Sequence, residues 1–281
     1  MSASLQLWPH AENSPSQSDF MQRCLQLAQY GSGNTAPNPL VGAVLVHNGK
    51  IIGEGYHEQY GGPHAEVNCL QSVKLADRPL ITHSILYVSL EPCCHQGKTP
   101  PCTDLIIREK IPKVVIGIRD PFPEVDGKGI EKLIANGISI EYPVLATLSK
   151  KINRRFFTFH LKKRPFIILK WAETANHKMA SADGTRLKIS NAFTDRLVHK
   201  WRSEEAGILV GTKTALTDNP ELTNRLWTGK SPTRIVLDRS LSLPDHLKIF
   251  DGSVPTILLN EKKNQEIGNL IFKKIHTDRQ L

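Results

Sequence analysis

Residues 84–118 read SILYVSLEPCCHQGKTPPCTDLIIREKIPKVVIGI, and the order of elements in this stretch decides the fold. Its apolar beginning predicts a buried strand over 84–90, followed by a helix over 103–110 and a second strand over 114–118. A strand, a helix and a strand in this order are typical of a sheet covered by helices. The loop between the first strand and the helix contains three cysteines.

Helices and strands also alternate on both sides of this stretch. The predicted elements are a helix capped by Asp19 and ending near Gly31, a hairpin over 41–55, a helix from His64, a helix over 128–136 and a strand over 138–142. We therefore predict an α/β domain over residues 19–147 whose sheet is covered on both faces. A disordered tail rich in Ser, Asn, Pro and Gln is expected over residues 1–18.

The second half of the chain predicts a smaller domain of the same class. The expected elements are a basic helical connector over 148–164, a strand over 166–171, a helix over 191–202, and strands over 207–211, 234–237 and 256–259. Residues 270–281 show no closing element. We expect an incomplete α/β domain over residues 165–281, with an unpaired sheet edge that favours association.

Composition and charge exclude several classes of protein. Of the 281 residues, 40% are hydrophobic and 22% charged, as in globular proteins with two domains. No apolar run could cross a bilayer, no secretory signal opens the chain, and five cysteines do not suit a disulfide framework, so we expect a reducing cytoplasm. The net charge is −2 over residues 1–150 and +11 over 151–281. This favours a phosphorylated small molecule over a nucleic acid or a basic surface without a ligand.

One histidine and two of the cysteines predict a zinc site. His64 opens a helix, Cys93 follows a strand, and Cys102 opens the next helix. One imidazole and two thiolates are protein ligands of a catalytic Zn²⁺, which keeps its fourth position for water. A helix start also stabilises a thiolate, so Cys102 suits a metal ligand better than an inert packed thiol.

Glu66 is expected to move protons beside this metal. Hydrolysis of an amino group from a pyrimidine needs a proton taken from water and protons delivered to the ring nitrogen and the leaving ammonia. His-x-Glu combined with Pro-Cys is typical of zinc deaminases, in which the glutamate has this role and is not a ligand. The other cysteines are expected to be packed thiols, Cys94 beside the site and Cys24 and Cys69 in the core.

The loop between the two zinc cysteines identifies the family that the sequence resembles. Eight residues separate Cys93 from Cys102, and residues 91–102 match the pattern Glu-Pro-Cys-x-His-x-Gly-(Arg/Lys)-Thr-Pro-Pro-Cys of the bifunctional riboflavin-biosynthesis deaminase/reductases. Further matches lie at residues 38–42, 53–57, 208–211 and 218–225. The resemblance implies a cytidine-deaminase-like three-layer domain followed by a dihydrofolate-reductase-like domain. It also implies deamination of a diaminopyrimidinone carrying a ribosyl phosphate, and NADPH-dependent reduction of the ribosyl chain.

The resemblance also implies which residues contact the ligands. In the deaminase half the implied substrate contacts are Asn38, His57, His95, Lys98, Thr99 and Asp120. In the reductase half they are Arg202, Leu222 and Arg225 for the substrate, and Lys170, Thr214 and Asp218 for NADPH. Asn38 offers a paired donor and acceptor to a pyrimidinone edge, and Lys98 offers charge to a phosphate. Phe122 stands where the family has asparagine, so one substrate hydrogen bond is expected to be missing.

The reductase half departs further from the family pattern. Residues 174–178 read TANHK in place of Ser-Leu-Asp-Gly-Arg, and Lys188 stands in place of a tryptophan. The family's Glu-Gly-Gly segment, whose backbone wraps the cofactor phosphates, is not found in the sequence. Since such glycine-rich turns hold dinucleotide phosphates, we expect robust deamination and weak or absent NADPH binding.

Two other functions share some of these features. A zinc deaminase acting on a nucleic acid base would have the same His-x-Glu core, but the acidic first half and the eight-residue cysteine spacing disfavour it. A structural zinc protein would need a fourth protein ligand, for which Cys94 and His95 are the near candidates. No nucleic acid or membrane partner is expected, and the sequence leaves open whether copies of the chain form a homo-oligomer.

Overall fold

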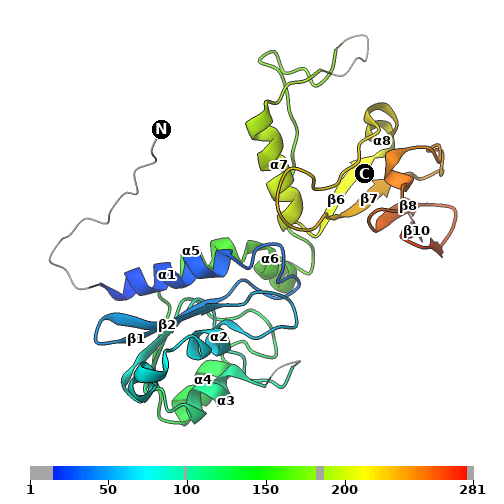
Figure 1. Ribbon diagram of the computed structural model, residues 1–281. Coiled ribbons are helices and arrows are strands. Elements are labelled where there is room, and N and C mark those ends of the chain that lie inside the picture. The colour runs from blue at the N-terminus through cyan, green and yellow to red at the C-terminus, as the bar shows by residue number, and fades with distance from the viewer. Residues whose placement is uncertain (1–14, 98–99, 182–186, 277–281) are drawn as a thin grey trace. The chain divides into compact units, whose positions relative to one another are not determined.

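The computed structural model of the chain describes residues 15–97, 100–181 and 187–276. The chain forms two compact units, residues 1–166 and 167–281 (Figure 1). Each unit contains its own five-stranded sheet. No helix among the described residues has the length and apolar character needed to cross a membrane.

The sheet of the first unit has the strand order β2-β1-β3-β4-β5. Its strands are β1 (Gly42–His47), β2 (Lys50–Tyr56), β3 (Ile85–Val88), β4 (Lys113–Ile116) and β5 (Ser139–Glu141). β1 pairs antiparallel with β2 and β3, whereas β3, β4 and β5 run parallel. Asn48 and Gly49 both have positive φ, as a tight hairpin turn requires.

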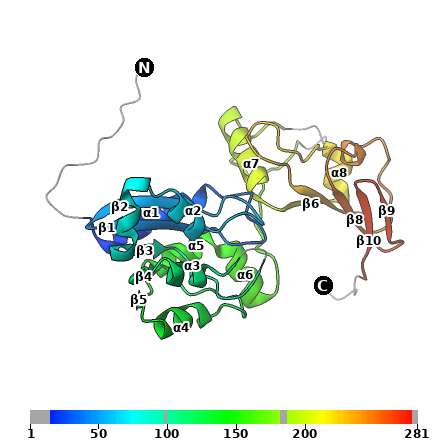
Figure 2. The same cartoon turned by 60° about the horizontal axis from the view of Figure 1, so that its bottom comes forward.

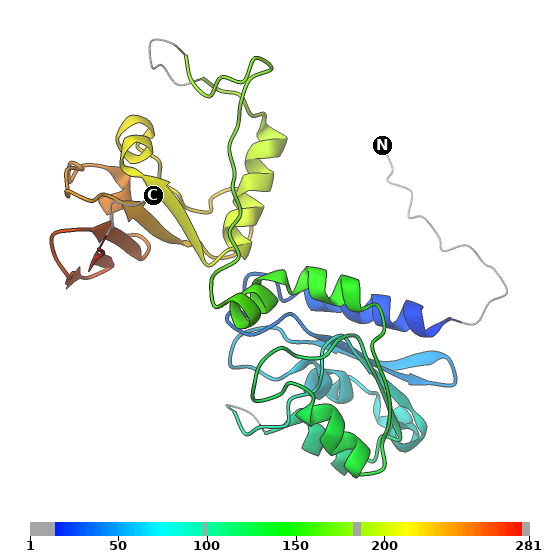
Figure 3. The same ribbon diagram turned by 180° about the vertical axis from the view of Figure 1, so that it is seen from behind.

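Helices cover both faces of this sheet, so the predicted three-layer arrangement is confirmed (Figures 1 and 2). One face carries α1 (Gln17–Gln29) and α5 (Ala146–Ile152), which lie side by side in Figure 3. The other face carries α2 (Ala65–Gln71), α3 (Cys102–Arg108) and α4 (Lys128–Ala135). The short helix η1 (Leu75–His83) precedes β3, and α6 (Arg154–Lys162) follows α5. Alternate side chains of β1, β2, β3 and β4 enter the two cores, as the two-residue strand period requires.

Helix α2 lies directly on the backbone of β2 at Gly55. A methyl group at this position would lie 2.7 Å from the carbonyl oxygen of Ala65 and would also overlap the backbone of Asn68 and Cys69. Only glycine permits this approach.

The start of α1 differs from the prediction. Ser16, not Asp19, is the N-cap residue: its hydroxyl accepts from the Asp19 N–H, while the Asp19 carboxylate accepts from the Ser16 N–H. This reciprocal capping box starts the helix at Gln17, so residues 17 and 18 belong to α1 and not to a tail. Residues 1–14 of the expected tail lie outside the described residues.

The sheet of the second unit has the strand order β6-β7-β8-β10-β9. Its strands are β6 (Gly207–Gly211), β7 (Thr233–Leu237), β8 (Thr256–Asn260), β9 (Gln265–Ile267) and β10 (Leu270–Lys274). All run parallel except β9, which is antiparallel to β10. The helices are α7 (Ala192–Glu204), α8 (Thr212–Asp218) and the short η2 (Lys248–Phe250). The apolar core includes Ala215, Val236 and Ile249.

Two predictions for this unit are wrong. Residues 166–171 form no strand, because strand propensity needs a neighbouring strand, and no described strand pairs with this segment. Its side chains Ile167, Leu169 and Trp171 are accordingly 62, 78 and 59% exposed. No closing element is predicted over residues 270–281, but residues 270–274 form β10, which continues the parallel sheet beside β8 and pairs with β9.

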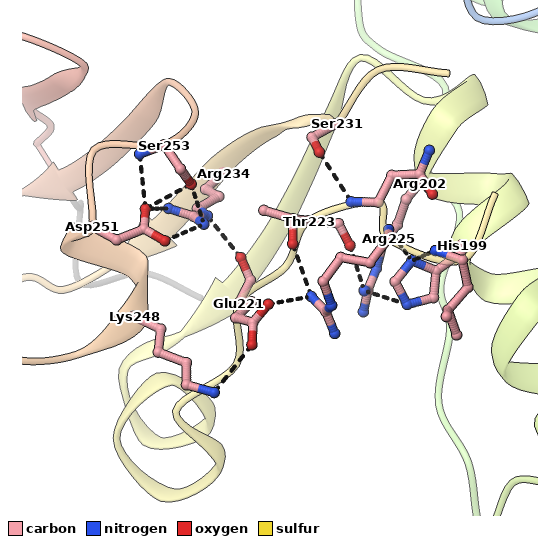
Figure 4. Close-up of polar contacts among 12 residues, drawn as sticks. His199, Arg202, Glu221, Thr223, Arg225, Ser231, Arg234, Lys248, Asp251 and Ser253 are labelled. Atoms are coloured by element: carbon pink, nitrogen blue, oxygen red, sulfur yellow. Dashed lines mark hydrogen bonds and ion pairs between the residues drawn. The ribbon is translucent and has the colours of Figure 1, made fainter. Parts of the chain in front are cut away.

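A fully buried arginine connects the second sheet to the loop after η2. Arg234 on β7 is 0% exposed, and its guanidinium donates to both carboxylate oxygens of Asp251 at 2.7 and 3.2 Å (Figure 4). It also donates to the carbonyl oxygens of Glu221 and Ile249. The Arg234 guanidinium holds the pKa of Asp251 far below its ordinary value.

We expect Asp251→Asn to lower the free energy of unfolding of the second unit by about 2 kcal/mol at pH 7, because Arg234 keeps its carbonyl partners but loses its counter-ion. A lowered carboxyl pKa stabilises above the unfolded pKa of about 3.9, so the difference from wild type should shrink as the pH falls below that value. Urea unfolding followed by the fluorescence of Trp171, Trp201 and Trp227 measures both effects. Asp245→Asn, at an exposed position, is the control, and a pH-independent difference would contradict this account.

Candidate active site

Three elements bring the predicted zinc ligands together. His64 is the N-cap residue of α2, Cys93 lies in the loop after β3, and Cys102 is the first residue of α3. The Sγ atoms of Cys93 and Cys102 lie 3.5 and 3.3 Å from His64 Nδ1. All three ligand atoms lie within 4.8 Å of one another, and within the described ranges they form the one such group.

This donor set fits a zinc ion. Tetrahedral zinc with ordinary Zn–S and Zn–N bonds would separate sulfur from nitrogen by about 3.6 Å, close to the spacing observed. Hydrogen bonds from Cys102 and from His64 lower the pKa of Cys93, which favours its thiolate, and the same hydrogen bond raises the pKa of Cys102. Cys94 stands apart from the group, since its Sγ contacts the Glu124 carbonyl oxygen at 3.5 Å.

Glu66 lies in the first turn of α2, next to this group but outside it. Its side chain lines the same pocket as His64 and Cys93 and is only 3% exposed. Burial raises the pKa of its carboxyl group above the ordinary value. A buried carboxyl with a raised pKa can both accept and donate a proton near neutral pH.

The pocket is a cavity of about 380 Å³ that opens onto the zinc group. Four of the predicted substrate contacts line it, namely Asn38, His57, His95 and Asp120. Burial raises the pKa of Asp120 to about 7, and its Oδ1 accepts from the Phe122 N–H at 2.7 Å. The other two predicted contacts, Lys98 and Thr99, lie outside the described residues.

Asn38 and His57 form a hydrogen-bonded pair on one wall of this pocket. His57 Nδ1 lies 2.9 Å from the carbonyl oxygen of Pro63, so Nδ1 carries the proton and donates it there. The other ring nitrogen, Nε2, therefore accepts from Asn38 Nδ2 at 3.1 Å. Burial lowers the pKa of His57, which keeps the ring neutral. The pair fixes the Asn38 amide and leaves its carbonyl oxygen and one N–H for a ligand.

In the second unit, two of the three predicted substrate residues, Arg202 and Arg225, lie in one polar cluster (Figure 4). Arg202 Nη1 donates to the Thr223 carbonyl oxygen at 2.9 Å, and Arg225 pairs with Glu221 at 2.8 Å. Burial and the charge of Arg225 lower the pKa of Arg202, and its buried Nε finds no acceptor among the described residues. Two neighbouring guanidinium groups with a spare buried donor favour an anionic ligand. Leu222, the third predicted residue, is buried in the apolar core of this unit with Ala215 and Val236.

The predicted NADPH residues are all exposed. Thr214 and Asp218 are exposed on α8, and Lys170 is exposed in the segment that forms no strand.

Comparisons with known proteins cover both units. A family model for the cytidine and deoxycytidylate deaminase zinc-binding region matches residues 14–118, and one for the RibD C-terminal domain matches residues 165–279. The riboflavin biosynthesis protein RibD of Aquifex aeolicus is 42% identical over 92% of this chain and 72% of its own length. RibD of Escherichia coli is 35% identical over 92% of this chain and 69% of its own. The chain belongs to the RibD family.

Solved RibD structures agree with this membership. A Thermotoga maritima diaminohydroxyphosphoribosylaminopyrimidine deaminase/5-amino-6-(5-phosphoribosylamino)uracil reductase matches with a TM-score of 0.82 and 42% identity, over 89% of this chain and 71% of that one. Acinetobacter baumannii RibD matches with a TM-score of 0.81 and 32% identity, over 88% and 70%. The chain spans about two thirds of the length of the curated RibD relatives, with 59% for that of Actinobacillus pleuropneumoniae.

Sequence reasoning missed one buried carboxylate of this RibD chain. Glu91, which is 4% exposed, accepts hydrogen bonds from the backbone N–H groups of Asp120, Gly127, Gly129 and Ile130. It therefore connects the end of β3 to the segment that carries Asp120. The glycines at 127 and 129 were the signal available in the sequence, because they permit close backbone approach.

A row of rings along the pocket was also missed. The Phe122 ring centroid lies 5.7 Å from that of His95 and 5.2 Å from that of His160, and the His160 ring lies 4.3 Å from Phe156. His160 and Phe156 come from α6, within the segment predicted to be only a connector. The connector of this RibD chain therefore supplies part of the pocket wall.

Proposed function

We propose that this RibD chain hydrolyses an amino group from a diaminopyrimidinone that carries a ribosyl phosphate, as a step of riboflavin biosynthesis. One observation carries the proposal: His64, Cys93 and Cys102 meet beside the buried Glu66 in a single pocket. The names of the RibD relatives support the pathway, and the name of the Thermotoga maritima enzyme supports the substrate class.

In the proposed mechanism the zinc ligands are His64, Cys93 and Cys102. Zn²⁺, when bound, supplies a Lewis acid that lowers the pKa of water and stabilises developing negative charge. Glu66 takes a proton from the attacking water and delivers protons to the ring nitrogen and to the leaving ammonia, a task that its raised pKa suits. Asn38, fixed by the neutral His57, presents a donor and an acceptor to the pyrimidinone edge.

For the second unit we propose a reductase-like domain of the NADPH-dependent kind, whose Arg202 and Arg225 bind the phosphate of the sugar chain. We propose that this domain comprises residues 165–281. The deaminase domain ends at residue 147 and begins at Gln17, the first residue of α1. We assign the connector 148–164 to the deaminase pocket, because α6 lines it. Five free cysteines support a reducing compartment such as the cytoplasm.

We expect the two activities of this 281-residue chain to differ in strength. Ammonia release from the diaminopyrimidinone ribosyl phosphate should be robust. NADPH oxidation should be weak, because Lys170 is exposed in a segment that belongs to no described strand, and residues 174–178 depart from the family pattern. Parallel assays of ammonia and of NADPH absorbance test this. Absence of ammonia release would refute the proposed function, and NADPH consumption in step with ammonia release would refute the expected difference.

A further inference from the structure

The side chain of Asn153 makes two hydrogen bonds to a single residue of the pocket loop. Its Oδ1 accepts from the Leu40 N–H at 2.7 Å, and its Nδ2 donates to the Leu40 carbonyl oxygen at 2.8 Å. The two residues are 113 positions apart in the sequence. Asn153 is 2% exposed, so water does not compete for these bonds. The amide thus pairs with Leu40 as a neighbouring strand would.

The position of Asn153 in the chain indicates that this pairing is its main role. It stands between α5 and α6 and is the N-cap residue of α6, a place where asparagine commonly bonds to the first turn of the helix. Its side chain makes no such bond here. Both hydrogen bonds that the structure describes for the Asn153 side chain go to Leu40.

Leu40 lies within the part of the loop that forms the pocket wall. Asn38, Pro39 and Val41 line the pocket, whereas neither Leu40 nor Asn153 does. Among the described residues, Leu40 has no backbone partner, since β1 begins at Gly42. Its neighbours are held separately: the Val41 carbonyl oxygen accepts from the His57 N–H, and Asn38 Nδ2 bonds to the His57 ring. Without the Asn153 side chain, the Leu40 N–H and carbonyl oxygen would lose the hydrogen bonds that hold this part of the loop.

We propose that Asn153 is a positioning residue for the deamination reaction, which acts by holding Leu40 and thereby setting the place of the Asn38 amide against the substrate. This inference rests on the proposed function. It assigns a task in substrate binding to a segment that joins the two domains in the sequence. It also predicts that Asn153 and Asn38 act as one unit.

A double-mutant cycle tests this coupling on the zinc-loaded chain. Asn153→Leu keeps the size of the side chain and removes both bonds, and Asn153→Asp removes only the donor to the Leu40 carbonyl oxygen. We expect Asn153→Leu to raise KM for the diaminopyrimidinone ribosyl phosphate on the order of 10- to 100-fold, with a smaller change in kcat, because misplacement of a binding group has effects of this size. Asn38→Ala should raise KM similarly. In the Asn38→Ala background, Asn153→Leu should have little further effect, because the residue through which it acts is gone.

Asn136→Leu is the matched control, since Asn136 also follows a helix but is exposed, lies outside the pocket lining and bonds to the Lys132 carbonyl oxygen. Its KM should equal that of wild type, and all variants should keep one zinc per chain. An unchanged KM in Asn153→Leu, or multiplicative effects in the double variant, would overturn the proposal.

Amide hydrogen exchange of peptides covering residues 36–46 gives a readout that does not depend on activity. Asn153→Leu should speed exchange of the Leu40 amide by about tenfold or more, because that N–H loses its acceptor. Unchanged exchange would refute the hold on Leu40. If the wild-type chain releases no ammonia, the proposed function fails, and this measurement still decides whether Asn153 orders the loop.

Discussion

Replacing Glu66 with glutamine should lower the rate of ammonia release by about 100- to 10,000-fold, the range expected for loss of a general acid–base group. Glutamine has nearly the same size but neither takes a proton from water nor delivers one to the leaving group. The zinc content should stay at one ion per chain, because Glu66 lies outside the group of ligand atoms. Initial rates of ammonia formation together with elemental analysis measure both quantities.

Glu58→Gln is a matched control. It makes the same substitution at an exposed residue that does not line the pocket. Its rate should equal that of wild type. A Glu66→Gln variant that keeps its zinc and works within about tenfold of wild type would contradict the proton-transfer role, since so small a change corresponds to under about 1.4 kcal/mol in the barrier.

Replacing Cys102 with serine should remove the zinc and nearly all activity. Cys102 supplies one of the two thiolates, and a neutral hydroxyl neither balances the charge of the ion nor binds it comparably. We expect zinc to fall from one per chain to near zero and ammonia release to fall by at least about 1,000-fold, because the metal contributes several kcal/mol to the reaction. Chelation of the wild-type chain should have the same effect, and added zinc should restore activity.

Cys94→Ser provides the comparison for this experiment. Cys94 is adjacent to Cys93 in the sequence, yet its sulfur contacts the Glu124 carbonyl oxygen and not the zinc ligands. Zinc content and activity should therefore persist. If Cys94→Ser lost zinc while Cys102→Ser kept it, the ligand assignment would be wrong.

The zinc ligands could be predicted from the sequence because each belongs to a short local pattern. His64 and Cys102 stand at helix starts, and Cys93 lies in the loop after β3, so local secondary structure places all three near one another. The parallel order of β3 and β4 follows from the helix between them in the same way. Such local patterns depend little on contacts with residues that are distant in the sequence, so they can be predicted from the sequence.

Glu91 and Asn153 could not be found in this way. Each bonds to backbone groups of residues far along the chain, 29 to 39 positions away for Glu91 and 113 for Asn153. A backbone N–H or carbonyl group is present at almost every position, so Leu40 carries no sign of its contact with Asn153. For Glu91 the sequence of the partner segment offers only Gly127 and Gly129, which permit close approach without naming the partner. The expected strand over 166–171 failed for a related reason, because its pairing depends on a neighbouring strand that local composition does not specify.

The position of His64 and Glu66 depends on Gly55, a residue of β2 that lies outside the pocket lining. Helix α2, which carries His64 at its cap and Glu66 in its first turn, rests on the backbone of that glycine with no room for a methyl group. Any larger residue there would move the helix and, with it, the imidazole and the carboxylate relative to Cys93 and Cys102. The proposed deamination therefore depends on a position that belongs neither to the group of ligand atoms nor to the pocket lining.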